Sequence, residues 1–337
     1  MRVSLKDVAE HASVSIKTVS NVVNNYQHVT PAMRSRVQEA IDELGYRPNL
    51  TARNLRKGRT GIIALAVPEL GNPYFAELAG AVIDAAAERD VTVLLDHTRG
   101  EREQEVLVSQ GFRARVIDGL ILSPLELEAE DLAGREDDVP LVLLGEREYD
   151  LPYNHIAIDN VAAARTAVRH LIGRGRTRIA YLGARTDSAN RPAHLRLAGW
   201  RDELTDAGLP APDTLVGPTG GWDRGDGAEA MARLLDSGVR PDAVFAYNDL
   251  VAIGAMRVLH ERGLRVPWDV AVVGFDDIME GRFGAVTLTT VSPDKRAIAR
   301  LAVTSLLRHL EHPEGPVGRE LTAEFRLVER ESTLGRR

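Results

Sequence analysis

From residue 61 onward, short apolar runs alternate with longer segments whose apolar residues recur at helical spacing. The apolar runs lie at residues 61–68, 91–96, 118–123, 141–145, 155–159, 178–183, 243–248 and 270–276. Repeated strand–helix units predict parallel sheets covered by helices. Eight such units within about 270 residues suit two sheets better than one large sheet. We therefore expect an α/β body of two doubly wound parallel-sheet subdomains, with a ligand cleft at the carboxyl ends of their strands.

The first sixty residues have a different pattern, that of three short helices. Apolar residues recur at helical spacing over residues 5–12, 16–24 and 31–44. The expected caps are Ser4, Ser15 and Thr30 at the three starts and Gly45 at the last end. The third helix is expected to bury Met33, Val37, Ala40, Ile41 and Leu44. Two helices joined by a tight turn and followed by a third predict a helix-turn-helix head over residues 1–48.

Charge separates this head from the rest of the chain. Residues 1–60 hold ten Lys and Arg against five Asp and Glu, a net charge of +5, so the remainder of a chain of net charge −7 carries −12. A basic head on an acidic body favours a polyanion as the partner of the head alone. A solvated basic surface is the alternative interpretation.

The second helix carries hydrogen-bonding side chains on the side away from its valines. Lysine donates to guanine O6 and N7, and asparagine pairs with adenine N6 and N7, so Lys17 and Asn21 suit base edges. Side chains suited to phosphate oxygens are those of Ser15, Thr18, Ser20 and Asn24. A small helical bundle used for protein contacts is the alternative, but pattern and charge together favour DNA.

Several motifs of the head stand at fixed spacing, namely DVA at 7–9, VS..TVS.VVN at 14–24, HV at 28–29, R..V..A...LGY.PN at 34–49 and A..L at 52–55. With these motifs the head closely resembles the LacI/GalR family of bacterial transcriptional regulators. The body adds RLAGW at 196–200, ND..A.GAM at 248–256, VVGFDD at 272–277 and LTT at 288–290. The resemblance implies a sequence-specific regulator, expected to be a repressor, that is controlled allosterically by a small molecule bound between the subdomains.

The resemblance also implies how the regulator meets double-stranded DNA. It implies a homodimer whose heads read the two halves of a pseudo-palindromic operator, with Ile16, Lys17 and Asn21 at base edges in the major groove. Many relatives have arginine at the position of Asn21, so their operator bases do not carry over. No heptad repeat follows the body, so we expect a dimer rather than a tetramer joined by a coiled coil.

Residues 49–60 are implied to form a hinge between head and body. The stretch NLTARNLR is too short to be a stable helix alone in water, so its ordering is expected to depend on DNA binding. In the family this segment pairs with that of the dimer mate in the minor groove, a role that the resemblance assigns to Asn49, Ala52, Arg53, Leu55 and Arg56. It assigns to Leu55 the wedge that kinks a central base step.

The resemblance implies three passages of the chain between the two subdomains. The N-terminal subdomain is then made of residues 61–158 and 291–321, and the C-terminal one of 159–290 and 322–337. Periodicity alone does not place the third passage.

Candidate ligand contacts follow several of the predicted strands. They are Asn72, Tyr74, Phe75, Asn248, Asp249 and Asp276, with Arg196 and Trp222 elsewhere in the C-terminal half. Such side chains can hydrogen-bond hydroxyl groups and stack on a sugar or nucleobase ring. Without the resemblance, Tyr74 and Phe75 suit helix packing and Arg196 a surface ion pair. Helix capping is the corresponding alternative for Asn248 and Asp249.

The resemblance assigns effector binding to Tyr74, Phe75, Arg196, Trp222, Asn248 and Asp276. Gly145 stands where some relatives place a polar ligand contact, and the nearby Arg147 is the expected substitute. The effector is expected to be a sugar, or a nucleoside- or purine-like molecule, and no cofactor is expected.

Other classes of protein fit this sequence less well. It has no P-loop, no H-E-x-x-H and no G-x-S-x-G motif, and its nine histidines show no metal-ligand spacing, so we expect neither an enzyme nor a metal site. A transport-type binding protein fits the body but not the basic head. The N-terminus MRVSLKDVAEH lacks the apolar region of a secretion signal, and no apolar run is long enough to span a membrane, so the expected location is the cytoplasm.

Overall fold

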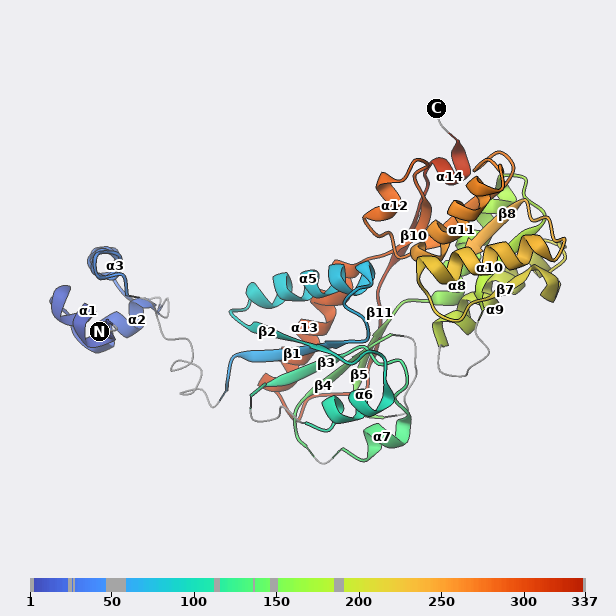
Figure 1. Ribbon diagram of the computed structural model, residues 1–337. Coiled ribbons are helices and arrows are strands. Elements are labelled where there is room, and N and C mark those ends of the chain that lie inside the picture. Colours follow the sequence, from blue (N-terminus) through green and yellow to red (C-terminus); the bar gives the residue numbers. More distant parts are fainter. Residues whose placement is uncertain are drawn as a thin grey trace. The chain divides into compact units, whose positions relative to one another are not determined.

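The computed structural model contains two units, a helical head within Met1–Gly61 and a body from Ile62 to Arg337 (Figure 1). The structure describes residues 3–23, 26, 28–46, 59–111, 116–135, 137–145, 151–184 and 191–335. Within these ranges, no helix is long and apolar enough to cross a membrane.

The head consists of three helices, as predicted. They are α1 (Leu5–His11), α2 (Ile16–Val23) and α3 (Pro31–Leu44). Ser4 and Thr30 cap α1 and α3 with their side-chain oxygens, and Ser15 Oγ accepts a hydrogen bond from a backbone N–H in the first turn of α2 at 3.1 Å. Gly45 ends α3 at a φ of 61°, a left-handed conformation that glycine adopts without strain. The helix-turn-helix prediction is confirmed.

The three helices share a small apolar core. Its buried residues are Val8, Ala9, Ala12, Val19, Val22, Val37, Ala40 and Tyr46. The expectation that α3 also buries Met33, Ile41 and Leu44 is wrong in degree, because all three are only half-buried. A unit of this size has too much surface for its volume to cover every apolar side chain.

The body contains two six-stranded sheets, each covered by helices. The first sheet has the order β11-β5-β4-β3-β1-β2, with all neighbours parallel. Its strands are β1 (Ile62–Val67), β2 (Thr92–His97), β3 (Gly119–Leu122), β4 (Leu141–Leu144), β5 (Asn154–Ala157) and β11 (Glu320–Thr322). The second sheet has the order β12-β10-β9-β8-β6-β7 and is parallel except for the pair β10–β12. Its strands are β6 (Ile179–Ala184), β7 (Val216–Pro218), β8 (Ala243–Ala246), β9 (Ala271–Phe275), β10 (Thr289–Pro293) and β12 (Phe325–Val328).

All eight predicted runs are strands, and the two-sheet α/β fold is confirmed. Four strands were not predicted, namely β7, β10, β11 and β12. Two of them, β7 and β11, are only three residues long, and β10 is rich in Thr, Ser and Pro rather than apolar residues. Without an apolar run, pairing with a neighbouring strand decides that such a segment is extended.

We call the first sheet with its helices the first lobe. These helices are α5 (Pro73–Ala87), α6 (Arg102–Ser109), α7 (Ala129–Ala133) and α13 (Lys295–Glu311). Along β1, Ile63 and Leu65 belong to the core that includes α5 and α13, whereas Ala64 and Ala66 belong to the core that includes Leu132 of α7. This alternation buries both faces of the sheet, as parallel sheets require.

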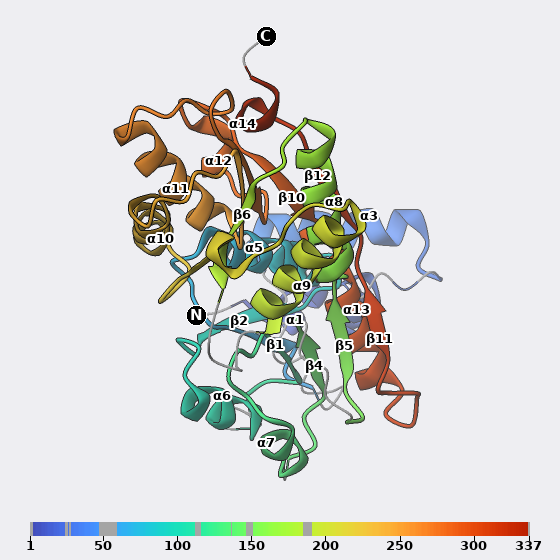
Figure 2. The same cartoon turned by 90° about the vertical axis from the view of Figure 1, so that its right-hand side faces the viewer.

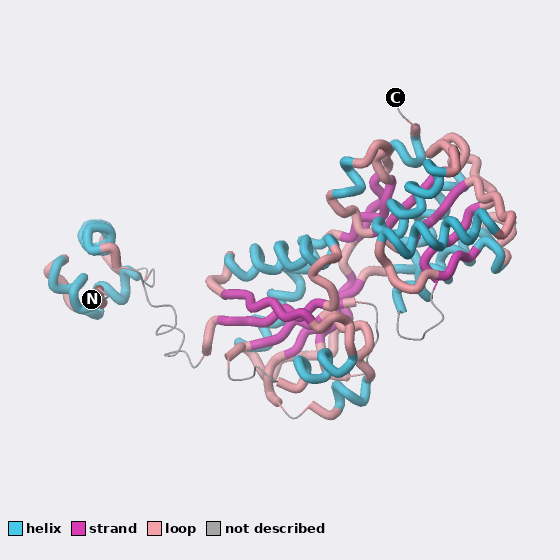
Figure 3. Tube along the Cα trace, in the orientation of Figure 1, coloured by secondary structure: helices cyan, strands magenta, loops and turns pink. Residues whose placement is uncertain are grey.

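The second sheet with its helices is the second lobe. These helices are α8 (Asn160–Gly173), α9 (Arg191–Asp206), α10 (Arg224–Asp236), α11 (Asp249–Glu261), α12 (Glu280–Phe283) and α14 (Glu331–Leu334). Figure 2 shows the packed pair α8 and α9 on one side of the sheet and the packed pair α10 and α11 on the other. In Figure 3 the strands form the middle of each lobe and the helices its outside.

The chain passes three times from one sheet to the other. The passages lie between β5 and β6, between β10 and β11, and between β11 and β12. By its contacts the body is nevertheless a single unit, so the exact subdomain limits 61–158 with 291–321 and 159–290 with 322–337 stay a prediction.

Candidate functional site

A cavity of about 580 Å³ is lined by residues of both lobes. Many of the lining residues come directly after strands, among them Pro68 after β1, Ser123 after β3, Tyr247 after β8 and Asp276 after β9. The cavity therefore lies at the carboxyl ends of both parallel sheets, where ligands of such sheets bind.

Seven of the predicted effector contacts line this cavity. They are Asn72, Tyr74, Phe75, Arg196, Trp222, Asn248 and Asp276. Arg147, the expected substitute for a polar contact at Gly145, lies outside the described residues, whereas Gly145 itself lines the cavity. Asp249 is fully buried and is not among the lining residues.

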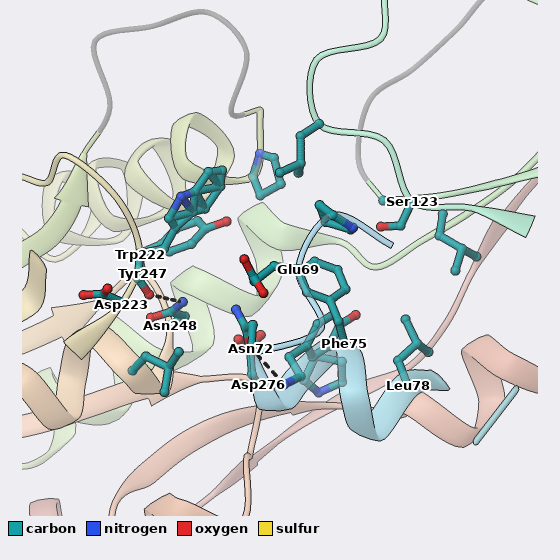
Figure 4. A pocket seen from close by; sticks show the side chains of 18 of the residues that line it. Glu69, Asn72, Phe75, Leu78, Ser123, Trp222, Asp223, Tyr247, Asn248 and Asp276 are labelled. Carbon is teal, nitrogen blue, oxygen red and sulfur yellow. Dashed lines mark hydrogen bonds between the residues drawn. The ribbon is translucent and has the colours of Figure 1, made fainter. Parts of the chain in front are cut away.

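Each lobe contributes an aromatic pair to the cavity wall. In the first lobe, the rings of Tyr74 and Phe75 meet edge to face with their centroids 5.2 Å apart. In the second lobe, Trp222 and Tyr247 meet in the same way at 5.9 Å. Figure 4 shows Trp222 and Tyr247 on one side of the cavity and Phe75 on another. Paired rings hold one another in place, so their faces can serve as rigid surfaces for stacking.

Arg196 is held firmly among groups of the second lobe. It is only 7% exposed, and its Nε donates to Asn160 Oδ1 at 2.7 Å while its Nη1 donates to the carbonyl oxygen of Tyr247 at 2.6 Å. Its guanidinium lies 3.5 Å from the ring centroid of Phe275 and 4.7 Å from that of Tyr247. Such burial excludes the alternative of a surface ion pair.

The two asparagines of the cavity wall also start helices. Asn248 Oδ1 accepts from Val251 N at 2.8 Å and its Nδ2 donates to the carbonyl oxygen of Trp222 at 3.0 Å. Asn72 Oδ1 accepts from Tyr74 N at 3.0 Å. The capping role is therefore present for Asn248, and it fixes the amide at the cavity wall.

Asp276 and Asp277 form a strained turn at the end of β9. Their φ values are 109° and 50°, in the left-handed region that non-glycine residues rarely adopt. Asp277 points away from the cavity wall into a cluster with Arg330, Arg282 and Ser292 at 2.5, 3.1 and 3.0 Å. Burial raises the pKa of Asp277, but the hydrogen bond and charge of Arg330, with the other two partners, lower it on balance. Backbone strain of this kind concentrates at functional sites.

Asp249 supports this turn from behind rather than acting as a cap. Its carboxylate accepts from Thr290 Oγ1 at 2.6 Å and from Ile278 N at 2.9 Å. Burial raises the pKa of Asp249 well above its ordinary value, and the nearby charge of Asp276 raises it further. The proton is therefore retained on Asp249 in the folded protein over a range of pH in which an unfolded chain has already lost it.

We expect Asp249→Asn to flatten the dependence of stability on pH. Because the folded state keeps a proton that the unfolded state releases near pH 4, stability falls as pH rises from there towards the folded pKa, by up to about 1.4 kcal/mol per pH unit. Asparagine cannot ionise, so the unfolding temperature of the variant should fall less between pH 4.5 and 8 than that of the unmodified protein. The control is Asp236→Asn, since Asp236 is exposed and pairs with Arg262. Parallel pH profiles for Asp249→Asn and the unmodified protein would contradict this prediction.

Sequence reasoning missed several residues of the cavity wall. The main ones are Tyr247, Glu69, Arg99, Ser123, Asp223, Arg224 and Asp226. Tyr247 immediately precedes Asn248, so the rule that ligands meet the residue after a strand could have found it. Asp223 and Asp226 form the capping box of α10 and carried no signal beyond that.

In the head, α2 presents the face expected of a DNA reader. Its sequence IKTVSNVV has no acidic residue, and Val19 and Val22 are buried in the head core. With about 100° of rotation per residue, positions 16, 17, 20 and 21 fall together on the other side. Lys17 is exposed, and the large apolar side chain of Ile16 is 50% exposed. Exposed isoleucine here matches an apolar contact such as a thymine methyl group.

The remaining predicted DNA contacts are only partly described. The hydroxyls of Ser15 and Thr18 lie 2.8 Å apart at the start of α2. Ser20 and Asn21 are half-buried. Asn24 and the hinge residues Asn49, Ala52, Arg53, Leu55 and Arg56 lie outside the described residues.

Two family models match the chain. That of bacterial regulatory proteins, lacI family, matches residues 4–49, and that of the periplasmic binding protein-like domain matches residues 168–333. The ribose operon repressor of Escherichia coli (strain K12) is 33% identical over 312 residues, which cover 92% of this chain and 94% of the repressor.

Solved structures show the same relationship. A transcriptional regulator of the LacI family from Sanguibacter keddieii DSM 10542 is 50% identical, with a TM-score of 0.76 over 82% of this chain and 99% of that one. The lac repressor dimer bound to operator and the anti-inducer ONPF is 30% identical, with a TM-score of 0.80 over 99% of each chain.

A helix-turn-helix head on a two-lobed body with a ligand cavity defines a DNA-binding transcriptional regulator under small-molecule control. The chain belongs to the LacI family of bacterial regulatory proteins. The family consists of DNA-binding regulators rather than enzymes, and these act in the cytoplasm, where bacterial DNA lies.

Proposed function

We propose that the protein is a homodimeric repressor that binds a pseudo-palindromic operator and responds to a sugar in the cavity between its lobes. The observation that carries the proposal is the cavity wall, to which both lobes contribute aromatic and hydrogen-bonding side chains. A ligand that touches both lobes can change how they sit against each other. The likeness to the lac repressor dimer bound to operator supports both dimer formation and operator binding.

On the DNA side, α2 of each head is placed in the major groove. Ile16, Lys17 and Asn21 contact base edges there. The hydroxyl-rich start of α2, Ser15 and Thr18, suits a phosphate, because the first backbone N–H groups of a helix point the same way. Ser20 and Asn24 are the other proposed phosphate contacts.

The hinge segment, which follows the head in the chain, is placed in the minor groove. Its proposed contacts are Asn49, Ala52, Arg53, Leu55 and Arg56, with Leu55 as the wedge between base pairs. Ordering of so short a segment costs conformational entropy, which the contacts to DNA and to the partner's hinge would offset.

The charges of the cavity wall favour an uncharged ligand. The wall holds four carboxylates against three guanidinium groups, in Glu69, Asp223, Asp226, Asp276, Arg99, Arg196 and Arg224. Near balance of charge gives no net attraction for an anion, whereas hydroxyl groups can donate to carboxylates and accept from guanidinium groups. With aromatic faces beside them, these groups suit a sugar ring. The likeness to a ribose operon repressor supports this class.

A titration series identifies the effector class. The unfolding temperature is measured with D-ribose, other mono- and disaccharides, nucleosides and purine bases, because a ligand of the native state raises it by mass action. We expect one or more sugars to raise it and to change operator affinity, with a coupling free energy of about 1–3 kcal/mol. If only nucleosides or purine bases raise the unfolding temperature, the effector belongs to that class instead of the sugars, since purine rings also stack on aromatic side chains. No shift with any of them would overturn the proposal for the cavity.

Operator binding is tested by selection from a random double-stranded DNA library, followed by gel shift on the selected sequence. A pseudo-palindromic motif is expected, and failure to enrich any motif would overturn the DNA-binding proposal.

We expect Lys17→Ala to cost about 1–3 kcal/mol of binding to the selected operator and to relax base preference at one position of each half-site. The reason is that Lys17 lies exposed on the reading face of α2 and ends in a guanine-compatible donor. Lys6→Ala is the control, since Lys6 lies on α1 in an exposed pair with Glu10. Equal weakening on all sequences would make Lys17 a phosphate contact instead.

A further inference from the structure

One side chain of the first lobe reaches across to the strained turn of the second. Lys295 is the first residue of α13, and its Nζ donates to the backbone carbonyl oxygen of Asp276 and, at 3.3 Å, to that of Asp277. These carbonyls belong to the left-handed turn that follows β9. Asp276 lines the cavity, so Lys295 acts directly on the backbone of a residue in the cavity wall.

Glu77 of α5 completes this connection. Its Oε2 lies 2.9 Å from Lys295 Nζ, while its Oε1 accepts from Met279 N at 3.1 Å. Both carboxylate oxygens are therefore engaged, one with the cation in its own lobe and one with the backbone of the second lobe. The turn 276–279 is thus hydrogen-bonded to two side chains of the first lobe: it accepts from Lys295 Nζ and donates from Met279 N to Glu77.

The position of Lys295 is unfavourable unless these contacts compensate. A cation at the N-terminus of a helix opposes the helix dipole. The side chain is only 14% exposed, and a mostly buried charge is costly unless it is paired and hydrogen-bonded. The ion pair with Glu77 and the two carbonyl acceptors meet this requirement, and they are available only while the lobes keep their present arrangement.

We propose that Glu77 and Lys295 form a latch between the lobes, which holds the turn 276–279 in place and sets the position of Asp276 in the cavity wall. Any widening between the lobes must break the hydrogen bonds that Lys295 donates to the turn and the one that Met279 N donates to Glu77. A ligand held by Tyr74 and Phe75 on one side and by Asp276 on the other would span the same gap. Tyr74 also has its ring centroid 5.6 Å from Lys295 Nζ, so the latch lies directly behind the wall that the ligand touches.

The latch is tested by measuring a distance between the lobes, which needs neither operator nor effector. The chain has no cysteine, so Glu103→Cys on α6 and Arg257→Cys on α11 place spin labels at two exposed positions, one in each lobe. Labelled chains are diluted with unlabelled protein so that each measured distance lies within one chain. Double electron–electron resonance then gives the distance distribution.

Glu77→Gln and Lys295→Met are expected to shift this distribution to longer distances and to broaden it. Glu229→Gln is the matched control, since Glu229 is 70% exposed and pairs with Arg233 within the same helix, α10. Glu77→Gln keeps the size of the side chain but removes its charge and replaces one of the two acceptor oxygens by an NH2 donor, so it tests the latch even if Lys295→Met folds poorly. Distributions for Glu77→Gln that match the unmodified protein would overturn the proposal. This result would leave the proposed repressor function untouched, because that function is tested by operator and sugar binding.

Discussion

Replacing Gly254 with alanine, a better helix former, is expected to lower the unfolding temperature of the body rather than raise it. A Cβ at this position would lie 2.0 Å from the carbonyl oxygen of Arg224 and 2.8 Å from Ala228 N. Both atoms belong to the backbone of α10, which cannot move aside as a side chain could. The helices α10 and α11 must therefore separate, and buried side chains such as Met231 and Val251 lose their contacts.

The expected loss is about 3 kcal/mol, at the upper end of the usual cost of overpacking. Because α10 follows Trp222 and α11 starts at the Asn248 cap, the same change should also weaken any ligand response. Calorimetry gives the stability, and thermal shift with the effective sugar gives the response. Gly80→Ala in α5 is the control, since nothing lies within 4 Å of its Cβ position. It should be neutral or stabilising by about 0.5–1 kcal/mol. Equal stability of the two variants would show that the helices do not approach this closely.

Arg196→Met is expected to lower stability by about 2–5 kcal/mol and to abolish the ligand response. Methionine keeps the apolar length of the side chain but leaves Asn160 Oδ1 and the carbonyl oxygen of Tyr247 without their donor. Each buried polar group left unsatisfied costs about 1–3 kcal/mol. The stacking of the guanidinium over Phe275 is lost as well.

Arg201→Met separates this effect from the loss of an arginine in general. Arg201 lies on the same helix, α9, in an exposed pair with Asp213 whose side chain is 90% exposed. Such a pair contributes about 0–1 kcal/mol, so the control should unfold close to the parent temperature and keep the ligand response. A small loss for Arg196→Met, comparable with that of Arg201→Met, would contradict the role of Arg196 as the anchor of the second-lobe wall.

Local patterns predicted the regular elements well because each depends on its own residues. The helices of the head follow from apolar spacing, from the caps Ser4 and Thr30 and from Gly45. Most of the eight apolar runs became strands that are buried on both faces, as strands inside a parallel sheet are, whereas the edge strand β2 is largely exposed. The missed strands β7, β10 and β11 have no such run, and β12 is only four residues with an arginine among them, so pairing with a neighbour in the sheet decides that they are extended.

Part of the cavity wall could be predicted because the positions of residues that follow strands can be read from the sequence. Asn72, Asn248 and Asp276 follow strands, and the carboxyl ends of parallel strands meet at one edge. Asp249, by contrast, lies next to Asn248 in the chain but turns into the protein to support the turn after β9. Only the packing around a side chain decides whether it lines the cavity or is buried behind the cavity wall.

By itself the sequence determined the class of the protein, because caps, apolar periodicity and family motifs are local properties of the chain. Only the tertiary structure decided that Arg196 is buried among aromatic rings, that Gly254 lies against the backbone of α10, and that Lys295 and Glu77 reach the turn after β9. Each of these features joins residues far apart in the chain. Their contacts depend on how sheets and helices pack in three dimensions, and a spacing along the sequence does not record that packing.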